Sequence, residues 1–285
     1  MIVTPIKIQG KKTKIIPNII ELSKINDETI WVEPFLGSGE VLFNVNPKKA
    51  YVSDNNEYVI KLYNDIKSKK ITSSIVREFL EKHGKKLEEL GEEYYYKMRT
   101  DFNKNHDSLY FLFLNRSCFN GIIRFNSKNE FNVPFCRKNN RYSKSLITKI
   151  VNQVKAIEDI IESHGDDWQF VCCDWLDTYK KFENKKGILY YFDPPYIKRY
   201  SDYFDKWTEE INDKFFKTLQ NSKNIFLLSN WYENAYRKND NIINSFDNDN
   251  RFVIHKINHF YHVGGKEINR NEIIECIVEK KETID

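Results

Sequence analysis

The sequence has few cysteines and no long apolar run. Its five cysteines form no paired Cys-x-x-Cys framework, which argues for reduced thiols and against a zinc site. No run approaches the roughly 18 apolar residues of a membrane-spanning helix. Proline, glycine and four lysines interrupt the chain before Asn18, where a targeting segment would need an apolar core. These absences predict a cytoplasmic protein without a metal site or a membrane anchor.

The chain also lacks a large excess of charge of one sign. Its 45 Lys and Arg residues face 41 Asp and Glu residues, a formal net charge of +4. The charge is unevenly distributed, because residues 116–149 contain eight basic residues and one acidic residue, a local charge of +7. Such a concentration is typical of a surface that binds a polyanion. The length of 285 residues allows one or two domains with a sizeable core.

Asp193-Pro194-Pro195-Tyr196 follows the apolar run 187–192. A short, aromatic run closed by two prolines is typical of a buried strand, so Asp193 is expected at the carboxyl edge of a sheet, where ligands bind. The Asp193 carboxylate and the Pro194 carbonyl could each accept one N–H of an exocyclic amine and localise its lone pair. Pro195 would hold the loop, and Tyr196 would stack on a base taken out of its helix. A rigid turn without function is the competing interpretation.

A second group of motifs indicates a nucleoside site. Residues 29–35 are predicted to form a strand, and Gly37 and Gly39 open the predicted helix 40–45, where glycine lets the backbone approach a ligand closely. Asp54 ends the next predicted strand. Its distance in sequence from the end of the first strand is close to that of the carboxylate that binds ribose hydroxyls in nucleotide-binding folds.

The third glycine of a dinucleotide motif is missing from this turn. This favours a nucleoside cofactor without phosphates, namely S-adenosylmethionine. Glu33 is a candidate partner for the amino group of its methionine part, although a structurally paired acid is an equal alternative. Segments 252–261 and 272–280 predict a closing antiparallel pair of strands.

Segments 122–126 and 130–135 flank Ser127-Lys128-Asn129 and predict a β-hairpin inside the basic region. A ribbon that carries Arg and Asn can enter the major groove of DNA, where Arg reads guanine and Asn reads adenine. An ordinary solvated hairpin is the alternative.

Together these motifs resemble the Dam-type DNA adenine-N6 methyltransferases of the D12 class, alpha group, and most fully the EcoRV-type modification methyltransferases. The resemblance implies an α/β fold, with a doubly wound Rossmann-like sheet and an inserted helical and β-hairpin DNA-recognition domain. Residues 1–56 and 165–285 would form the S-adenosylmethionine-binding catalytic domain, and residues 57–164 the target-recognition domain. The likeness extends over nearly the whole chain, through segments 4–7, 9–10, 12–14, 31–35, 111–121, 123–128, 131–136 and 259–264.

The resemblance also implies roles for individual residues. In such enzymes the amino-terminal basic segment folds over the cofactor, and their lysine aligns with Lys12, whereas Ile8 stands where they often have tryptophan. The catalytic residues would be Asp193, Pro194, Pro195 and Tyr196. The cofactor would be bound by Gln9, Lys12, Glu33, Phe35, Gly37, Gly39, Asp54, Asp174, Trp175 and Asp193. The DNA would be bound by Arg116, Asn120, Arg124, Asn126, Asn132, Arg137 and Lys138.

Within these sets, Arg124 is the expected base reader, and Asn120 would fill the space left by the extruded base. The resemblance implies metal-free methyl transfer from S-adenosylmethionine to adenine N6 in double-stranded DNA, at a GAT-containing site such as GATATC. A cognate restriction endonuclease acting on the same site would be a partner. Two alternatives stay open: a catalytically inactive DNA-binding regulator on a methyltransferase scaffold, and an N-methyltransferase of RNA or of a protein amide.

Overall fold

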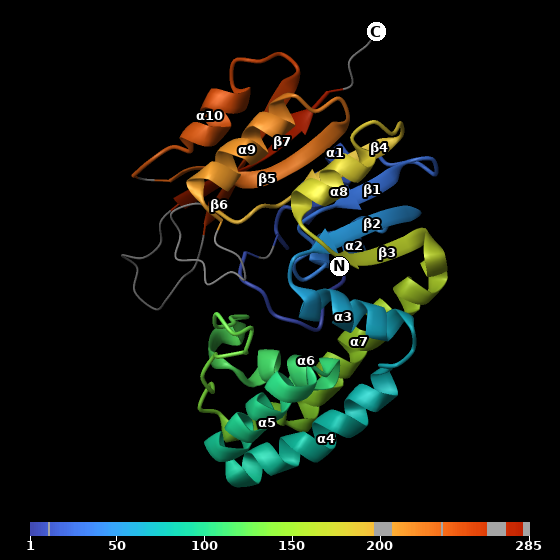
Figure 1. Cartoon of the computed structure of the whole chain (residues 1–285), viewed down its shortest axis with the longest axis vertical. Helices are drawn as coiled ribbons and strands as arrows, with labels where there is room; N and C mark the ends of the chain where they lie inside the picture. The colour runs from blue at the N-terminus through green and yellow to red at the C-terminus, as the bar shows by residue number, and fades with distance from the viewer. Residues whose placement is uncertain (11, 197–206, 235, 261–271, 282–285) are drawn as a thin grey trace.

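The computed structural model describes residues 1–10, 12–196, 207–234, 236–260 and 272–281 (Figure 1). No helix within these ranges is long and apolar enough to span a membrane. The elements are α1 (Ile16–Ser23), β1 (Ile30–Glu33), α2 (Glu40–Val45), β2 (Lys49–Asp54), α3 (Glu57–Lys67), α4 (Ser73–Leu90), α5 (Glu92–Asn105), α6 (Ser108–Ser117), α7 (Lys144–His164), β3 (Trp168–Cys172), α8 (Trp175–Phe182), β4 (Ile188–Phe192), α9 (Glu209–Gln220), β5 (Ile225–Asn234), α10 (Asp240–Phe246), β6 (Phe252–Phe260) and β7 (Glu272–Lys280).

The strands form one seven-stranded sheet in the order β3-β2-β1-β4-β5-β7-β6. The pairs from β3 to β5 are parallel, and β7 runs antiparallel to both β5 and β6. The chain winds outward from β1 through β2 to β3, then returns to β4 on the other side of β1. The predicted doubly wound α/β class is therefore confirmed, and the carboxyl ends of β1 and β4 flank the point where the strand order reverses.

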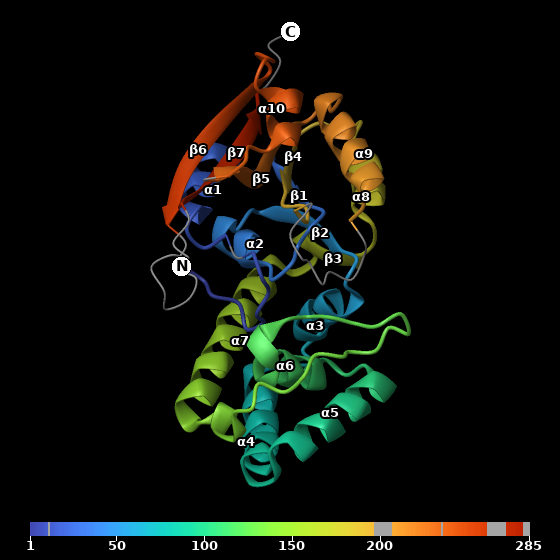
Figure 2. The same cartoon turned by 90° about the vertical axis from the view of Figure 1, so that its left-hand side faces the viewer.

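The strand residues alternate between two apolar cores, as period-two side chains must. Trp31, Val52 and Tyr191 face the core that includes α1, α2 and α3. Val32 and Tyr190 face the second core, which α8, α9 and α10 cover. Figure 2 shows α8 and α9 on one side of the sheet and α1 on the other. Because both faces are covered, the central strands are largely apolar, and all five residues of β4 are buried.

Helices α4, α5 and α6 form the lower part of the molecule in Figure 1, α7 runs from there up toward β3, and α3 lies beside α7, between α6 and the sheet. Helix α3 contacts β3 directly, because the side chains of Asn64 and Lys67 donate hydrogen bonds to the carbonyls of Phe170 (3.1 Å) and Trp168 (2.9 Å). The predicted division at residues 56/57 would assign α3 to the recognition region. That division stays a prediction, but the contacts of α3 are with the sheet as well as with α6 and α7.

The predicted hairpin is present as two antiparallel arms without a continuous ladder. Phe125 and Phe131 form an isolated bridge, and Asn126 and Glu130 close the turn through a backbone hydrogen bond of 2.9 Å. The second arm is held by α5 instead. Asn103 accepts from the Phe131 amide (2.8 Å) and donates to the Phe131 carbonyl (3.2 Å), and Tyr95 donates to the Val133 carbonyl (2.8 Å). Side chains of α5 thus form hydrogen bonds with backbone groups that a neighbouring strand would otherwise pair.

Element boundaries were predicted less well than element types. The closing pair is confirmed as β6 and β7, but β7 inserts between β5 and β6, which only tertiary pairing reveals. Strand β3 ends at Cys172, and shortly after it Asp174 caps helix α8, which was not predicted. Helix α10 was also not predicted.

We expect Asn103→Ala to lower the free energy of unfolding by about 1–3 kcal/mol, because it leaves two backbone groups of the buried Phe131 without a partner. Lys104→Ala, one position along α5 and exposed, should change the unfolding free energy by less than about 0.5 kcal/mol. Urea unfolding measures both. Equal effects of the two substitutions would mean that α5 does not hold the hairpin arm.

Candidate functional site

Three acidic side chains predicted to belong to one site do come together at the carboxyl ends of the parallel strands. Glu33 ends β1, Asp54 ends β2, and Asp193 follows β4 directly. Strand β1 pairs with β2 on one side and with β4 on the other, so these three strand ends are neighbours. Glu33 lies close enough to Asp193 and Asp54 for both carboxylates to raise its pKa.

The turn between β1 and α2 depends on its glycines. Gly37 and Gly39 adopt left-handed φ values of 53° and 72°. The Asp54 carboxylate accepts hydrogen bonds from the backbone N–H of Gly37 (2.8 Å) and of Asn56 (2.9 Å), so it braces this turn. A Cβ on Gly37 would meet no heavy atom within 4 Å, whereas one on Gly39 would lie 2.8 Å from the ring of Phe43. The backbone at Gly37 therefore borders open space that a ligand can approach.

Glu33 is a buried carboxyl group at the same edge, with 1% of its surface exposed. Trp31 donates a hydrogen bond of 2.9 Å from Nε1 to Oε2 of Glu33. Burial raises the pKa of Glu33 well above its usual value, and this hydrogen bond offsets the rise only in part. A positively charged ligand group beside Glu33 would favour the ionised form.

Aromatic side chains form one wall beside the glycine turn. Phe35 stacks on Trp175 with ring centroids 6.5 Å apart and meets the edge of Trp207 at 5.6 Å. Trp175 itself is buried, and the preceding Asp174 is exposed and accepts a hydrogen bond of 2.8 Å from the backbone N–H of Leu176. Asp174 thus serves as the N-cap of α8. A carboxylate has further acceptor positions, so capping does not prevent it from binding a ligand.

Asp193 forms an ion pair with Lys12 at 2.8 Å, in surroundings largely closed to water. Lys12 also donates to the Gly10 carbonyl at 3.0 Å, and its ammonium lies 5.2 Å from the ring centroid of Tyr196. Burial raises the pKa of the Asp193 carboxyl, and the ammonium opposes that rise. Burial likewise opposes the charge of Lys12, but Asp193 and then Tyr196 hold the pKa of Lys12 well above its usual range.

The amino-terminal segment reaches Asp193 because it is fastened to α6. Asn115 accepts from the Lys7 amide (2.7 Å) and donates to the Lys7 carbonyl (2.8 Å), as a paired strand would. Arg116 donates to the Pro5 carbonyl at 3.1 Å. Burial, with Arg141 and Arg116 nearby, lowers the pKa of Lys7 to about 8. Gln9 is exposed on this segment.

The predicted DNA-binding residues fall into two groups. Arg116 is buried, 5% exposed, where it holds the amino-terminal segment, so little of it is open to a partner. Arg124 and Asn132 are paired across the hairpin by a hydrogen bond of 2.8 Å, and Asn126 accepts from the turn amides of Lys128 and Glu130. The exposed members of the set are Asn120, Asn126, Arg137 and Lys138.

Two contributors to the site were not predicted from the sequence. Asn115 lies in segment 111–121, which was noted only for its resemblance to the family. An Asn inside an apolar helix segment is itself a signal of a buried hydrogen-bonding role. Glu275 on β7 is 5% exposed and raises the pKa of Asp193. The residues around Glu275 in the sequence do not indicate this role, because β7 comes close to Asp193 only through the order of the strands in the sheet.

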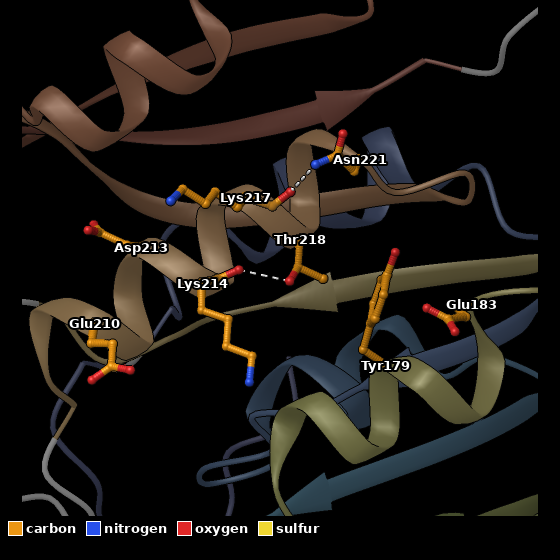
Figure 3. A pocket seen from close by; sticks show the side chains of 8 residues that line it. All are labelled: Tyr179, Glu183, Glu210, Asp213, Lys214, Lys217, Thr218 and Asn221. Carbon is orange, nitrogen blue, oxygen red and sulfur yellow. Dashed lines mark hydrogen bonds between the residues drawn. The ribbon is translucent and has the colours of Figure 1, made fainter.

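An open hollow of about 820 Å³ lies apart from this edge, between α8 and α9 (Figure 3). Tyr179 and Glu183 line it from α8, and Lys214 and Lys217 from α9. None of the predicted site residues lines it. Within the parts of the chain that the structure describes, no three or more His, Cys, Asp or Glu side chains are grouped as metal ligands.

A doubly wound sheet with a glycine turn at its switch point and an Asp-Pro-Pro-Tyr loop after β4 is the arrangement of an amino-methyltransferase. The chain belongs to the D12 class N6 adenine-specific DNA methyltransferase family, whose model matches residues 9–263.

Among proteins of known name, the chain is 31% identical over 261 residues to the Type II methyltransferase M.MjaIII of Methanocaldococcus jannaschii, covering 80% of this chain and 83% of that protein. It is 27% identical over 286 residues to M.FokI of Planomicrobium okeanokoites, covering 96% of this chain and 42% of that protein. It is 31% identical over 179 residues to the DNA adenine methylase of Haemophilus influenzae, covering 60% of this chain and 56% of that protein.

We expect alanine to be tolerated unequally at the two glycines. At Gly37 it should cost about 1–2 kcal/mol of unfolding free energy, the strain of a left-handed residue that carries a Cβ. At Gly39 it should cost at least about 1 kcal/mol more, because the Cβ would also overlap the Phe43 ring. Urea unfolding followed by tryptophan fluorescence compares the two variants. A Gly39→Ala variant as stable as Gly37→Ala would refute the close contact with Phe43.

Proposed function

We propose that this protein transfers a methyl group from S-adenosylmethionine to adenine N6 in double-stranded DNA. The observation that carries the proposal is Asp193, a largely buried carboxylate directly after β4, at the same edge of the sheet as the Gly37 turn and Asp54. In the Asp193 to Tyr196 loop, the carboxylate would accept one N–H of the adenine amine and the Pro194 carbonyl the other. As the lone pair of N6 localises, the N6–CH₃ bond would form while the bond between the methyl carbon and the sulfonium sulfur breaks. S-adenosylhomocysteine would leave as the neutral thioether, and N6 would lose its proton to water.

The residues at the strand ends fit the cofactor. The open space at Gly37 and the carboxylates of Asp54 and Asp174 suit a nucleoside, and the buried acid Glu33 suits the amino group of its methionine part. S-adenosylmethionine supplies a methyl group that its sulfonium already activates. Phe35 offers an aromatic face toward a positive charge, and Tyr196 one for stacking on the base.

For DNA, the support is the charge and exposure of the hairpin region. Arg137 and Lys138 are exposed, as is Asn120, and no acid lies near the two basic residues in sequence, so they suit phosphate contacts. Arg124, oriented by Asn132, is the proposed base reader, and Asn120 the residue that fills the space of the extruded base. The contacts of Arg116 suit a supporting role better than direct contact with DNA. Under this proposal α4 to α7 and the hairpin make up the recognition region.

The target is proposed to contain GAT, as in GATATC. Methylation-sensitive sequencing of DNA from cells that express the chain would identify the site. A restriction endonuclease acting on the same sequence and a cytoplasmic location stay predictions from the sequence. Methyl transfer to plasmid DNA, compared with RNA and with a protein amide, separates this function from the two alternatives.

Asp193→Ala should slow single-turnover methyl transfer by roughly 10²–10³-fold or more, as expected when one preorganised polar contact to a transition state is removed. DNA binding should persist, because the exposed basic residues lie elsewhere. Asp177→Ala removes an exposed carboxylate on α8 and should leave the rate unchanged. Transfer of tritiated methyl to DNA measures both variants. A near-normal rate for Asp193→Ala would disprove the proposed role of its carboxylate.

The affinity for DNA should fall steeply as salt increases. Lys138→Ala should reduce the slope of log K against log salt by about 1 if Lys138 contacts a phosphate. Lys214→Ala, an equally exposed lysine on α9, provides the matched control and should leave the slope unchanged (Figure 3). Fluorescence anisotropy over a salt series gives the slopes. Identical slopes for Lys138→Ala and the wild type would exclude a phosphate contact there.

A further inference from the structure

Lys12 and Asp193 form an ion pair that joins two distant parts of the chain at the methyl-transfer site. The Lys12 ammonium lies 2.8 Å from Oδ1 of Asp193, and the two side chains are 6% and 22% exposed. The backbone of Lys12 is fixed as well, because its carbonyl accepts from the amides of Ile15 (2.9 Å) and Ile16 (3.1 Å) at the start of α1. The ion pair therefore joins two segments whose backbones are held in place, one before α1 and the other directly after β4.

The groups around Asp193 would otherwise drive it toward the protonated form. Burial raises the pKa of Asp193, and Glu275 of β7 adds to that rise, while Glu33 of β1 lies close enough for Asp193 to raise the pKa of Glu33. Tyr191 of β4 and Tyr196 of the catalytic loop lie close enough to interact with it electrostatically. Among the described residues, Lys12 is the one cation that pairs with the Asp193 carboxylate. A carboxylate in such surroundings keeps its charge only if a cation compensates it.

We propose that Lys12 is a positioning residue for methyl transfer, which keeps the Asp193 carboxylate ionised and orients it toward the adenine amine. This inference rests on the proposed function of Asp193. The ion pair uses Oδ1, so Oδ2 can accept an N–H of the amine. A protonated Asp193 would turn one of its oxygens into a donor and accept the amine more weakly.

This role differs from the cofactor contact that the family resemblance implies for Lys12. A residue that only covers the cofactor would change the affinity for the cofactor and leave the titration of Asp193 unchanged. A residue that sets the charge of Asp193 would change how methyl transfer depends on pH. The two roles therefore predict different measurements.

The variants are Lys12→Met, which removes the charge but keeps an extended side chain, and Lys12→Arg, which keeps the charge. Lys14→Met is the matched control, since Lys14 is exposed in the same basic segment. Single-turnover methyl transfer to DNA is measured against pH with S-adenosylmethionine and DNA both saturating. Calorimetry with S-adenosylhomocysteine gives the affinity for the cofactor product. NMR titration of the Asp193 carboxyl carbon, assigned with Asp193→Asn, reports ionisation without any activity.

Methyl transfer is retained above the pKa of Asp193 and lost as the pH falls through it. In Lys12→Met we expect both the acidic side of the rate–pH profile and the titration of Asp193 to move to higher pH. The expected shift is at least about one pH unit, because a close opposite charge lowers the pKa of a carboxylate by at least that much. Raising the pH should recover much of the rate. Lys12→Arg and Lys14→Met should keep the wild-type profile.

An unchanged pH profile and an unchanged Asp193 titration in folded Lys12→Met would overturn the inference. Weaker binding of S-adenosylhomocysteine together with those unchanged profiles would assign Lys12 to the cofactor alone. Absence of methyl transfer by the wild type at every pH would instead overturn the proposed function, and the NMR titration would still decide whether Lys12 controls the charge of Asp193.

Discussion

A carboxylate removed from water needs a cation beside it, and the site of this protein is arranged around that requirement. Asp193 lies directly after β4, and its partner Lys12 comes from the amino-terminal segment, 181 residues earlier in the chain. Two further acids, Glu33 and Glu275, lie at the same edge. With Asp54 as a fourth acid and one paired lysine among the described side chains, the edge suits ligands that bring positive charge or N–H donors.

The amino-terminal segment physically links the proposed recognition region to the sheet edge that holds Asp193. The side chain of Asn115 on α6 forms hydrogen bonds with both the amide and the carbonyl of Lys7. Five residues later, Lys12 forms the ion pair with Asp193. Arg116 strengthens the first attachment by donating to the Pro5 carbonyl. Lys12, the cation beside Asp193, is thus tied to α6 through the segment that Asn115 holds. The same helix continues into the loop that carries Asn120, so the two regions meet through covalent and hydrogen-bonded contacts.

Much of the fold and part of the site could be predicted from short stretches of sequence. The apolar run before Asp193 was predicted to form a buried strand, and all five residues of β4 are buried. Gly37 and Gly39 were predicted to open a helix, and both adopt left-handed φ values in the turn before α2. Asp54 was correctly expected at a strand end. Its contacts with the amides of Gly37 and Asn56 were not foreseen, because hydrogen-bond partners depend on how β2 lies beside the turn. The hairpin was predicted from its turn residues, but α5 decided that its second arm would bond to Asn103 and Tyr95.

The sequence by itself determined the family, the order of the motifs and the residue types at the catalytic loop, because these depend on local composition and spacing. Only the tertiary structure decided which charged residues are available. Arg116 and Lys138 look alike in a basic segment, yet one is buried against Pro5 and the other is exposed. Glu275 reaches Asp193 because β7 inserts between β5 and β6, and Lys12 reaches it because Asn115 holds the segment before it. Burial and pairing between distant segments set those charges, and neither is encoded in a local pattern.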